Sequence, residues 1–587
     1  MTAADRVDDF VRANFPWLFA VVLVAAVGLR LPALGTPSLN DAEARNGFAA
    51  IEVAAGQPAP ADMTDSAAYS ALTALAFTLA GSSSASARFW PAVAGVLLAA
   101  VPLLMLKKLG PAPTLAAGLL LALSPASAAL SRTADGAMLG ALGFATLAAL
   151  LYANEAATRP WLTGIVAGLM FVAGPAGLGG LLIVVATSAL ERVTVGRLWS
   201  QAADSHAWHQ IGRSLRAPIF WVGFVAAFLS LSTALVFPNA IGALGQGLTT
   251  WGRSFLFIGT TGAVQALLLI VAYETLAVAF AIPSLRTFAK SADLGIFMPL
   301  LTATALVYFF ARPGRVPGDA LFVVVPILVL AVIGIRETLR LFSRETVNGV
   351  IVLEVSLILG LGIFAHQSLT AYAVQPDVPT YGPLRLALGG VALLGIFLVA
   401  GLFATGWSGN VPGAVGGLGL GLAVMLLVGE LSAVWGVSYS RRATSNELWW
   451  QSVSPRELEV LVASVAEISA RETGTPDELA VVVQGKRDTA LGWAFKDFTN
   501  LRFVDEPARS STPAVFIAPL VGDPGSERMP SLAADYVGQG STVRERRAWQ
   551  QMPPEPVGWW LYRMGTDVRE RVILWVREDV QFPPAQP

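Results

Sequence analysis

Three acidic residues stand beside long apolar segments, where their side chains are available for chemistry. Asp41 and Glu43 lie in the stretch S-L-N-D-A-E-A-R-N-G-F (38–48), which directly follows an apolar run. Asp135 lies in S-P-A-S-A-A-L-S-R-T-A-D-G-A-M-L (124–139), between two further apolar runs. Ionisable residues at the ends of membrane segments are costly, so each one is a functional hypothesis. Asp135 is placed to position a hydroxyl group or a cation. Acidic pairs also hold divalent metals through oxygen, but two or three carboxylates are too few to argue for a metal site.

Five arginines accompany these acids, and an arginine at a membrane surface suits a phosphate group because its guanidinium presents a rigid fork of donors. Arg132 lies three residues before Asp135, and we interpret it as support for a phosphate. The other candidates are Arg45, Arg88, Arg312 and Arg315.

Each candidate also has a purely structural interpretation, and the residues alone leave both open. The run that begins at Asp41 predicts an amphipathic helix along the membrane surface, and Asp41 as its N-cap would stabilise that helix by about 1 kcal/mol. Arg132 and Asp135 would form an ion pair on one helical turn. Interfacial arginines commonly anchor helices at the lipid headgroups, an interpretation that applies to Arg88, Arg312 and Arg315.

The composition indicates that membrane helices position these residues. Of the 587 residues, 55% are hydrophobic and only 13% are charged, against roughly a quarter charged in ordinary soluble domains. The net charge of -1 gives no electrostatic footprint for nucleic acid. The chain has no cysteine, which excludes disulfides, thiolate metal sites and cysteine nucleophiles.

Apolar windows of about 18 to 22 residues, the length that a helix needs to cross a bilayer, recur over the first three quarters of the chain. They predict about thirteen transmembrane helices. We place these helices near 16–34, 89–106, 112–130, 136–153, 161–174, 177–190, 217–237, 263–283, 293–311, 318–335, 349–368, 385–405 and 412–436. The segment 67–81 is predicted to lie flat in the interface, because Lys and Arg then concentrate on the side that becomes cytoplasmic. The N-terminus is therefore predicted to be cytoplasmic, and the acidic stretches and the C-terminus to lie outside.

A soluble domain is predicted after about Ser438, where charged residues become frequent. The motif S-P-R-E (454–457) predicts a capping box that opens a helix. A second helix is predicted at 490–498, and strands at 479–484, 501–505, 514–519, 558–563 and 572–577. The chain thus divides into a membrane domain (1–437), with juxtamembrane helices at about 38–82, and an extracytoplasmic α/β domain (438–587).

Several motifs follow one another in a specific order. The first span ends L-R-L-P-A-L-G, and the acidic motif N-D-A-E-A-R comes next. The later motifs are Y-S-A-L-T-A-L-A-F-T-L-A-G, S-A-R-F-W-P-A-V-A-G-V-L, L-S-P-A-S-A-A-L-S-R-T-A-D, G-L-M-F-V-A-G-P-A-G-L, R-P-G-R-V-P-G-D-A-L-F-V-V-V-P-I-L-V-L and W-A-F-K-D-F-T-N-L-R-F-V-D. In this order they resemble the membrane glycosyltransferases of C-type fold, family 39, which includes the protein mannosyltransferases and the bacterial aminoarabinose transferases.

The resemblance implies transfer of a sugar from a polyprenyl-phosphate donor to an acceptor hydroxyl, with inversion, on the outer face of a bacterial cytoplasmic membrane. It implies an acidic pair, Asp41 with Glu43, in which Asp41 is the general base. It further implies Arg132 as a ligand of the leaving phosphate and Asp135 as an orienting residue. The polyprenyl tail would lie between spans. The outer domain would cover the site or select a protein, lipid or glycan acceptor. The lipid-linked sugar is the substrate, and no cofactor is implied.

Two other classes of function stay open. The family motif has adjacent Asp and Glu, whereas here Ala42 separates Asp41 from Glu43. This difference favours a non-catalytic relative that serves as an accessory subunit of a larger membrane assembly. A lipid or solute transporter is the third interpretation, although inverted repeats, which many transporters have, are not detected.

Overall fold

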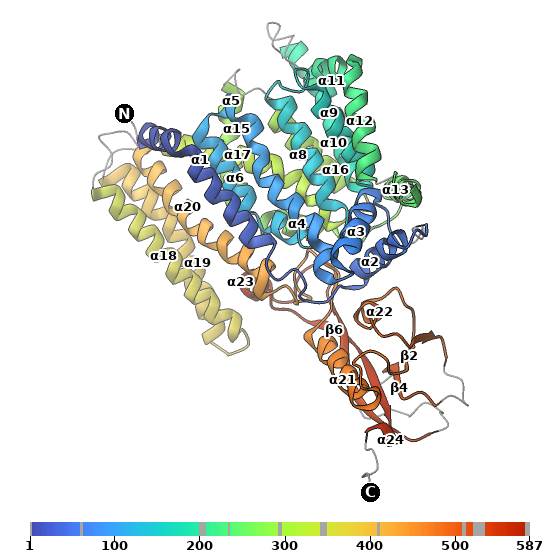
Figure 1. Cartoon of the computed structure of the whole chain (residues 1–587). Coiled ribbons are helices and arrows are strands. Elements are labelled where there is room, and N and C mark those ends of the chain that lie inside the picture. Colours follow the sequence, from blue (N-terminus) through green and yellow to red (C-terminus); the bar gives the residue numbers. More distant parts are fainter. Residues whose placement is uncertain are drawn as a thin grey trace.

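The chain forms a helical bundle, two surface helices at one end of the bundle, and a C-terminal domain that projects from that same end (Figure 1). The computed structural model describes residues 3–58, 63–198, 207–232, 235–236, 238–290, 296–340, 349–407, 411–506, 512–520 and 534–581. Parts of the predicted spans 217–237 and 293–311 lie outside the described residues. The architecture is the predicted one, a polytopic α-helical membrane domain followed by an α/β domain.

Helices, most of them apolar, make up the membrane domain. In chain order they are α1 (Ala3–Arg30), α4 (Ser84–Ala100), α5 (Leu106–Leu109), α6 (Pro111–Leu123), α7 (Pro125–Leu130), α8 (Ala137–Tyr152), α9 (Pro160–Val172), α10 (Pro175–Leu198), α11 (Ala207–Arg216), α12 (Pro218–Leu231), α13 (Gly242–Arg253), α14 (Ala263–Val271), α15 (Thr275–Lys290), α16 (Phe297–Ala311), α17 (Ala320–Arg340), α18 (Gly349–Val374), α19 (Tyr381–Leu402) and α20 (Val411–Trp435).

Helix length and composition identify a multi-pass membrane protein. Among the described residues, seven helices are long and apolar enough to cross a membrane, and the number becomes nine if each of two bent pairs is one span. The bent pairs are α11 with α12, at 83°, and α14 with α15, at 84°. Shorter apolar helices, α6, α8, α9 and α16, occupy four more of the predicted spans.

Two helices with basic residues lie at one end of the bundle. Lys107 and Lys108 lie on α5, and Arg213 and Arg216 lie on α11. Both helices lie at the end of the bundle that is opposite to the C-terminal domain (Figure 1). The surface helices α2 (Asp41–Ala54) and α3 (Ala67–Ala80) pack on each other at the other end. The sequence predicts the direction of the chain from the distribution of Lys and Arg, and this direction stays a prediction.

A six-stranded mixed sheet with the strand order β1-β5-β6-β4-β2-β3 forms the C-terminal domain. β2 runs parallel to β3 and β4, whereas β6 runs antiparallel to β4 and β5. The apolar side of α21 packs on the sheet, where Leu458, Leu461 and Val465 are buried. The strands are β1 (Ser452–Val453), β2 (Val481–Gln484), β3 (Leu501–Val504), β4 (Val515–Pro519), β5 (Tyr536–Arg547) and β6 (Asp567–Arg577). The helices are α21 (Arg456–Thr473), α22 (Ala490–Ala494), α23 (Pro556–Tyr562) and α24 (Glu578–Gln581).

Three details of this domain differ from the sequence prediction. The segment 558–563, predicted as a strand, lies in helix α23, because Pro556 fits the first turn of a helix and Trp559 is buried under it. The sequence does not predict strand β5, because its residues are mostly polar and show no clear alternation of buried and exposed positions. The predicted capping box at 454–457 is wrong: α21 has Pro455 as its N-cap, and the Ser454 hydroxyl donates to the Leu39 carbonyl at 2.8 Å.

A tryptophan of the C-terminal domain packs against α2. The Trp493 ring lies edge-on to Phe48, with 5.5 Å between ring centroids, and its Nε1 donates to Ser84 Oγ at 3.1 Å. Gly47 makes this approach possible, because a Cβ atom at Gly47 would stand 2.7 Å from Trp493. Arg487 forms a further ion pair with Glu52 on α2 at 3.2 Å. The helix that begins at the acidic motif is therefore also the docking surface of the C-terminal domain.

We expect Gly47→Ala to weaken this docking, because the added methyl group overlaps a buried ring that is fixed by its own hydrogen bond. Overpacking of this kind costs about 1–3 kcal/mol. The thermal unfolding midpoint of the purified full chain should fall. Gly212→Ala in α11 is the control, since its added methyl group meets no atom within 4 Å. Equal midpoints for both variants would show that Trp493 does not constrain α2.

Candidate active site

A cavity of about 590 Å³ lies where the surface helices, the bundle and the C-terminal domain meet. The first turn of α2 and the loop 130–137 before α8 both line it, so the stretches that carry Asp41 and Asp135 meet at one cavity. The loop before α3, helix α13 and the loop before α17 add further walls. The C-terminal domain closes the remaining side with Trp449, Trp450, Gln451, Ser452, Arg544 and Arg546.

The acidic motif has a different cap from the predicted one. Asn40, not Asp41, is the N-cap of α2: its side chain accepts from the Glu43 backbone N–H at 3.1 Å. The Glu43 carboxylate accepts in return from the Asn40 N–H at 3.2 Å, which completes a capping box. Asp41 is therefore the first helical residue. Its side chain is free of the capping task that the sequence allowed for it.

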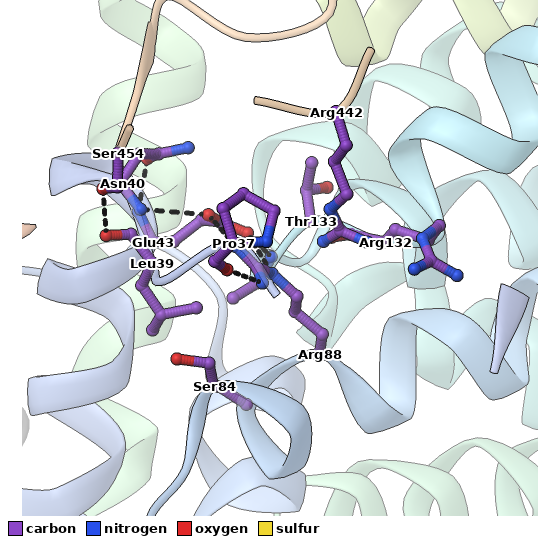
Figure 2. A network of polar contacts seen from close by, with 12 residues as sticks. Pro37, Leu39, Asn40, Glu43, Ser84, Arg88, Arg132, Thr133, Arg442 and Ser454 are labelled. Atoms are coloured by element: carbon purple, nitrogen blue, oxygen red, sulfur yellow. Dashed lines mark hydrogen bonds and ion pairs between the residues drawn. The ribbon is translucent and has the colours of Figure 1, made fainter. Parts of the chain in front are cut away.

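Glu43 is a buried carboxylate that holds several segments together. Arg88 on α4 donates to both of its oxygens, at 2.8 and 2.6 Å, and the Ala134 N–H donates at 3.0 Å. Figure 2 shows Arg88 and Glu43 facing each other, with Pro37 beside them. Burial opposes ionisation, yet the charge and hydrogen bonds of Arg88 hold the pKa of Glu43 below its ordinary value. All the donors around this carboxylate stabilise its charged form.

Asp41 reaches out of α2 to the C-terminal domain. Its Oδ1 accepts from the Ala490 N–H at 2.8 Å, and its Oδ2 forms an ion pair with Arg544 on β5. Arg544 also contacts Glu570 at 2.8 Å. Asp41 lines the cavity, but both of its oxygens are engaged by donors from the C-terminal domain.

Asp135 and Asp65 are the carboxyl groups on the bundle side of the cavity. Asp135 Oδ1 accepts from the Ala137 N–H at 3.0 Å. Burial raises the pKa of Asp135 to about 6, and the carboxylates of Glu43 and Asp65 add to the rise. Burial also raises the pKa of Asp65. The sequence does not single out Asp65. It lies in the short segment A-D-M-T-D-S-A, where its one charged neighbour is Asp62.

Of the five predicted phosphate arginines, Arg45 lines the cavity and the other four do not. Arg88 is occupied by Glu43. Arg312 is buried against Asp319 and Tyr308. Arg315 donates to backbone carbonyls of 309, 310 and 312. The structure thus gives Arg88, Arg312 and Arg315 internal partners in place of the predicted surface positions.

Arg132 closes the end of α1 and forms no ion pair with Asp135. Its guanidinium donates to the carbonyls of Arg30 and Ala33 at 2.9 and 3.1 Å. The backbone carbonyl of Arg132 accepts from the Arg442 guanidinium at 2.6 Å. A cation at a helix C-terminus is stabilised by the unpaired carbonyls and the helix dipole. Burial lowers the pKa of Arg132 to about 10. Figure 2 shows Arg132 and Arg442 side by side.

Two cavity arginines, Arg544 and Arg546, were missed by sequence reasoning. They come from a polar strand far along the chain, and their only sequence signal is the alternation R-E-R within β5. Within the described ranges, no three His, Asp or Glu side chains converge in a way that would hold a metal ion.

In sequence, the chain matches no family model and no curated protein. Its fold does match solved structures. ArnT from Cupriavidus metallidurans bound to undecaprenyl phosphate has a TM-score of 0.54 at 14% identity, over 96% of this chain and 99% of that one. The apo state of the same ArnT has a TM-score of 0.55 at 15% identity, over 96% and 98%. An oligosaccharyltransferase from Archaeoglobus fulgidus is less similar, with a TM-score of 0.43 at 11% identity, over 84% and 64%. The likeness to ArnT shows that the chain has the C-type glycosyltransferase fold.

We expect Arg88→Met to destabilise the protein by about 3–5 kcal/mol, because it leaves the buried Glu43 charge without its main partner. The double variant Glu43→Gln with Arg88→Met should recover part of that loss, since no uncompensated charge remains. Chemical unfolding of the purified full chain measures both. A double variant that is less stable than Arg88→Met alone would contradict this account of the pair.

Proposed function

We propose that the chain transfers a sugar from a polyprenyl-phosphate donor to an acceptor hydroxyl on the extracytoplasmic face of the bacterial cytoplasmic membrane, with inversion at the anomeric carbon. The observation that carries the proposal is the 590 Å³ cavity to which α2 and the loop before α8 both contribute carboxylates. The fold supports it, since ArnT of the same fold is bound to undecaprenyl phosphate.

Asp135 is the general base in this proposal. It lines the cavity and pairs with no Lys or Arg of the described part of the chain. With a pKa of about 6 it is mostly ionised at neutral pH and remains a competent proton acceptor. As the acceptor oxygen bonds to the anomeric carbon, its proton passes to Asp135. The bond from the anomeric carbon to the phosphate oxygen breaks, and its electron pair leaves with the phosphate.

The residues of the acidic motif take supporting roles. Glu43 has all its acceptor capacity engaged by Arg88, Asn40 and Ala134, so we assign it the task of fixing the loops around the cavity. Asp41 is held by Arg544 and Ala490 and positions the C-terminal domain. The base role that the family resemblance implies for Asp41 is therefore assigned to Asp135.

An accessory role in a membrane complex is the second candidate. It is favoured by Ala42, which interrupts the acidic pair, and by the ion pair that engages Asp41. Under this alternative the purified chain consumes no lipid-linked sugar and co-purifies with a partner in fixed stoichiometry.

We expect Asp135→Asn to slow sugar transfer by about 10²–10⁴-fold, the usual contribution of a general base. In the unaltered chain the rate should rise with pH through about 6 and then level off, because only the ionised carboxyl accepts a proton. The measurement is release of polyprenyl phosphate from a panel of polyprenyl-phosphate sugars as a function of pH.

Asp65→Asn is the matched control for this prediction. It removes a carboxylate that raises the Asp135 pKa. Transfer should therefore persist, and the rise of the transfer rate with pH should occur at lower pH. Full activity in Asp135→Asn, combined with a loss in Asp41→Asn, would return the base role to Asp41.

A further inference from the structure

We propose that Arg45, Arg544 and Arg546 form a binding site for a phosphate group, so that the C-terminal domain supplies two of its three cations. The proposal rests on the proposed function where it names the phosphate as that of the lipid-linked donor. It replaces the predicted set, of which Arg45 alone lines the cavity.

The strand geometry brings two of these arginines to the same wall. Arg544 and Arg546 are two residues apart on β5, so their side chains leave the same face of the sheet. Both line the cavity and both contact Glu570 on the neighbouring strand β6. Arg45 faces the cavity from α2, one turn after Asp41.

The charges around the cavity favour this wall for an anion. The cavity also carries four carboxyl groups, which repel a phosphate, so an anion is favoured only beside the arginines; the carboxyl groups belong to Asp41, Glu43, Asp65 and Asp135. Arg45 is exposed and forms no ion pair with a described residue. The Arg544 Nε is buried and donates to no described acceptor. These groups therefore retain unused capacity to donate to an anion.

Arginine suits the task because its planar fork donates two parallel hydrogen bonds to a phosphate. Arg544 already holds two carboxylates, Asp41 and Glu570. A phosphate at this wall would compete with Asp41 for the same guanidinium. Binding of the anion and docking of the C-terminal domain on α2 are thereby coupled through one side chain.

The test is binding of a polyprenyl phosphate to the purified full chain in detergent, beside the matching polyprenol and inorganic phosphate. Arg45→Gln and Arg546→Gln should each weaken binding of the polyprenyl phosphate by about tenfold or more, the size of a lost charged hydrogen bond. Arg546→Lys keeps the charge without the planar fork of donors, so its affinity should lie between those of Arg546→Gln and the unaltered chain. Arg569→Gln is the matched control, because Arg569 pairs with Glu545 and Asp567 and does not line the cavity.

Two results would overturn the proposal. In the first, the variants are folded by thermal melting and bind the polyprenyl phosphate as tightly as the unaltered chain. In the second, the unaltered chain binds the polyprenol as tightly as the polyprenyl phosphate. Arginine-dependent binding of the polyprenyl phosphate alone identifies a lipid-borne phosphate. Arginine-dependent binding of inorganic phosphate as well identifies a site for the phosphate group from either source.

Binding and transfer separate this proposal from the proposed function. Arginine-dependent phosphate binding with no sugar transfer supports the anion site and rejects the enzymatic function. Transfer that needs Asp135 but is indifferent to Arg45 and Arg546 supports the function and rejects this anion site.

Discussion

The buried carboxylate of Glu43 is the constraint on which the arrangement of the site depends. A charge removed from water is tolerated only when it is paired and hydrogen-bonded. Glu43 meets this condition with donors from α4, from the turn before α2 and from the loop before α8. Arg88 in turn donates to the carbonyls of Leu34 and Pro37 in the chain that leaves α1. Displacing any one of these segments would leave a buried charge or a buried donor without its partner. The loops that carry Asp41 and Asp135 are thereby fixed relative to each other.

A second constraint joins the membrane domain to the C-terminal domain. Helix α2 presents Glu43 to the bundle, and it presents Gly47, Phe48 and Asp41 to the C-terminal domain. The contact with the bundle is a buried ion pair, and the contacts with the C-terminal domain are an aromatic contact and a more exposed ion pair. Because both domains pack on the same short helix, a movement of the C-terminal domain acts directly on the first turn of α2. The cavity is a joint product of the two domains, since β5 and residues 449–452 form one of its sides.

Much of the architecture is predictable from the sequence, because apolar length and charge asymmetry are local signals. The meeting of 38–48 with 124–139 is also predictable, since both follow helix ends on the same side of the membrane. The positions of the arginine side chains are not predictable in this way. Arg132 caps a helix end and Arg45 faces a cavity. In the sequence, both are simply arginines near apolar runs. Only the three-dimensional positions of the carbonyls decide between them. Arg544 and Arg546 escape prediction for the opposite reason, because a polar strand distant in sequence gives no sign that it returns to α2.

The same chemistry of burial separates the carboxylate that fixes the loops, Glu43, from the one that we propose as the base, Asp135. Glu43 is buried and Asp135 is half-buried beside the same loop, and their donors differ. Arginine and backbone donors saturate Glu43 and hold its pKa down, whereas Asp135 has one backbone donor and two acidic neighbours, which hold its pKa up. In the described part of the chain, no arginine is among the main causes of the shift in the pKa of Asp135. Arg88 is neutralised by Glu43, and Arg132 points to the end of α1. A base and an anion site in one cavity require this separation: a cation close enough to hold a phosphate beside Asp135 would also lower its basicity. Placing two of the three cations on a strand of the C-terminal domain serves both requirements.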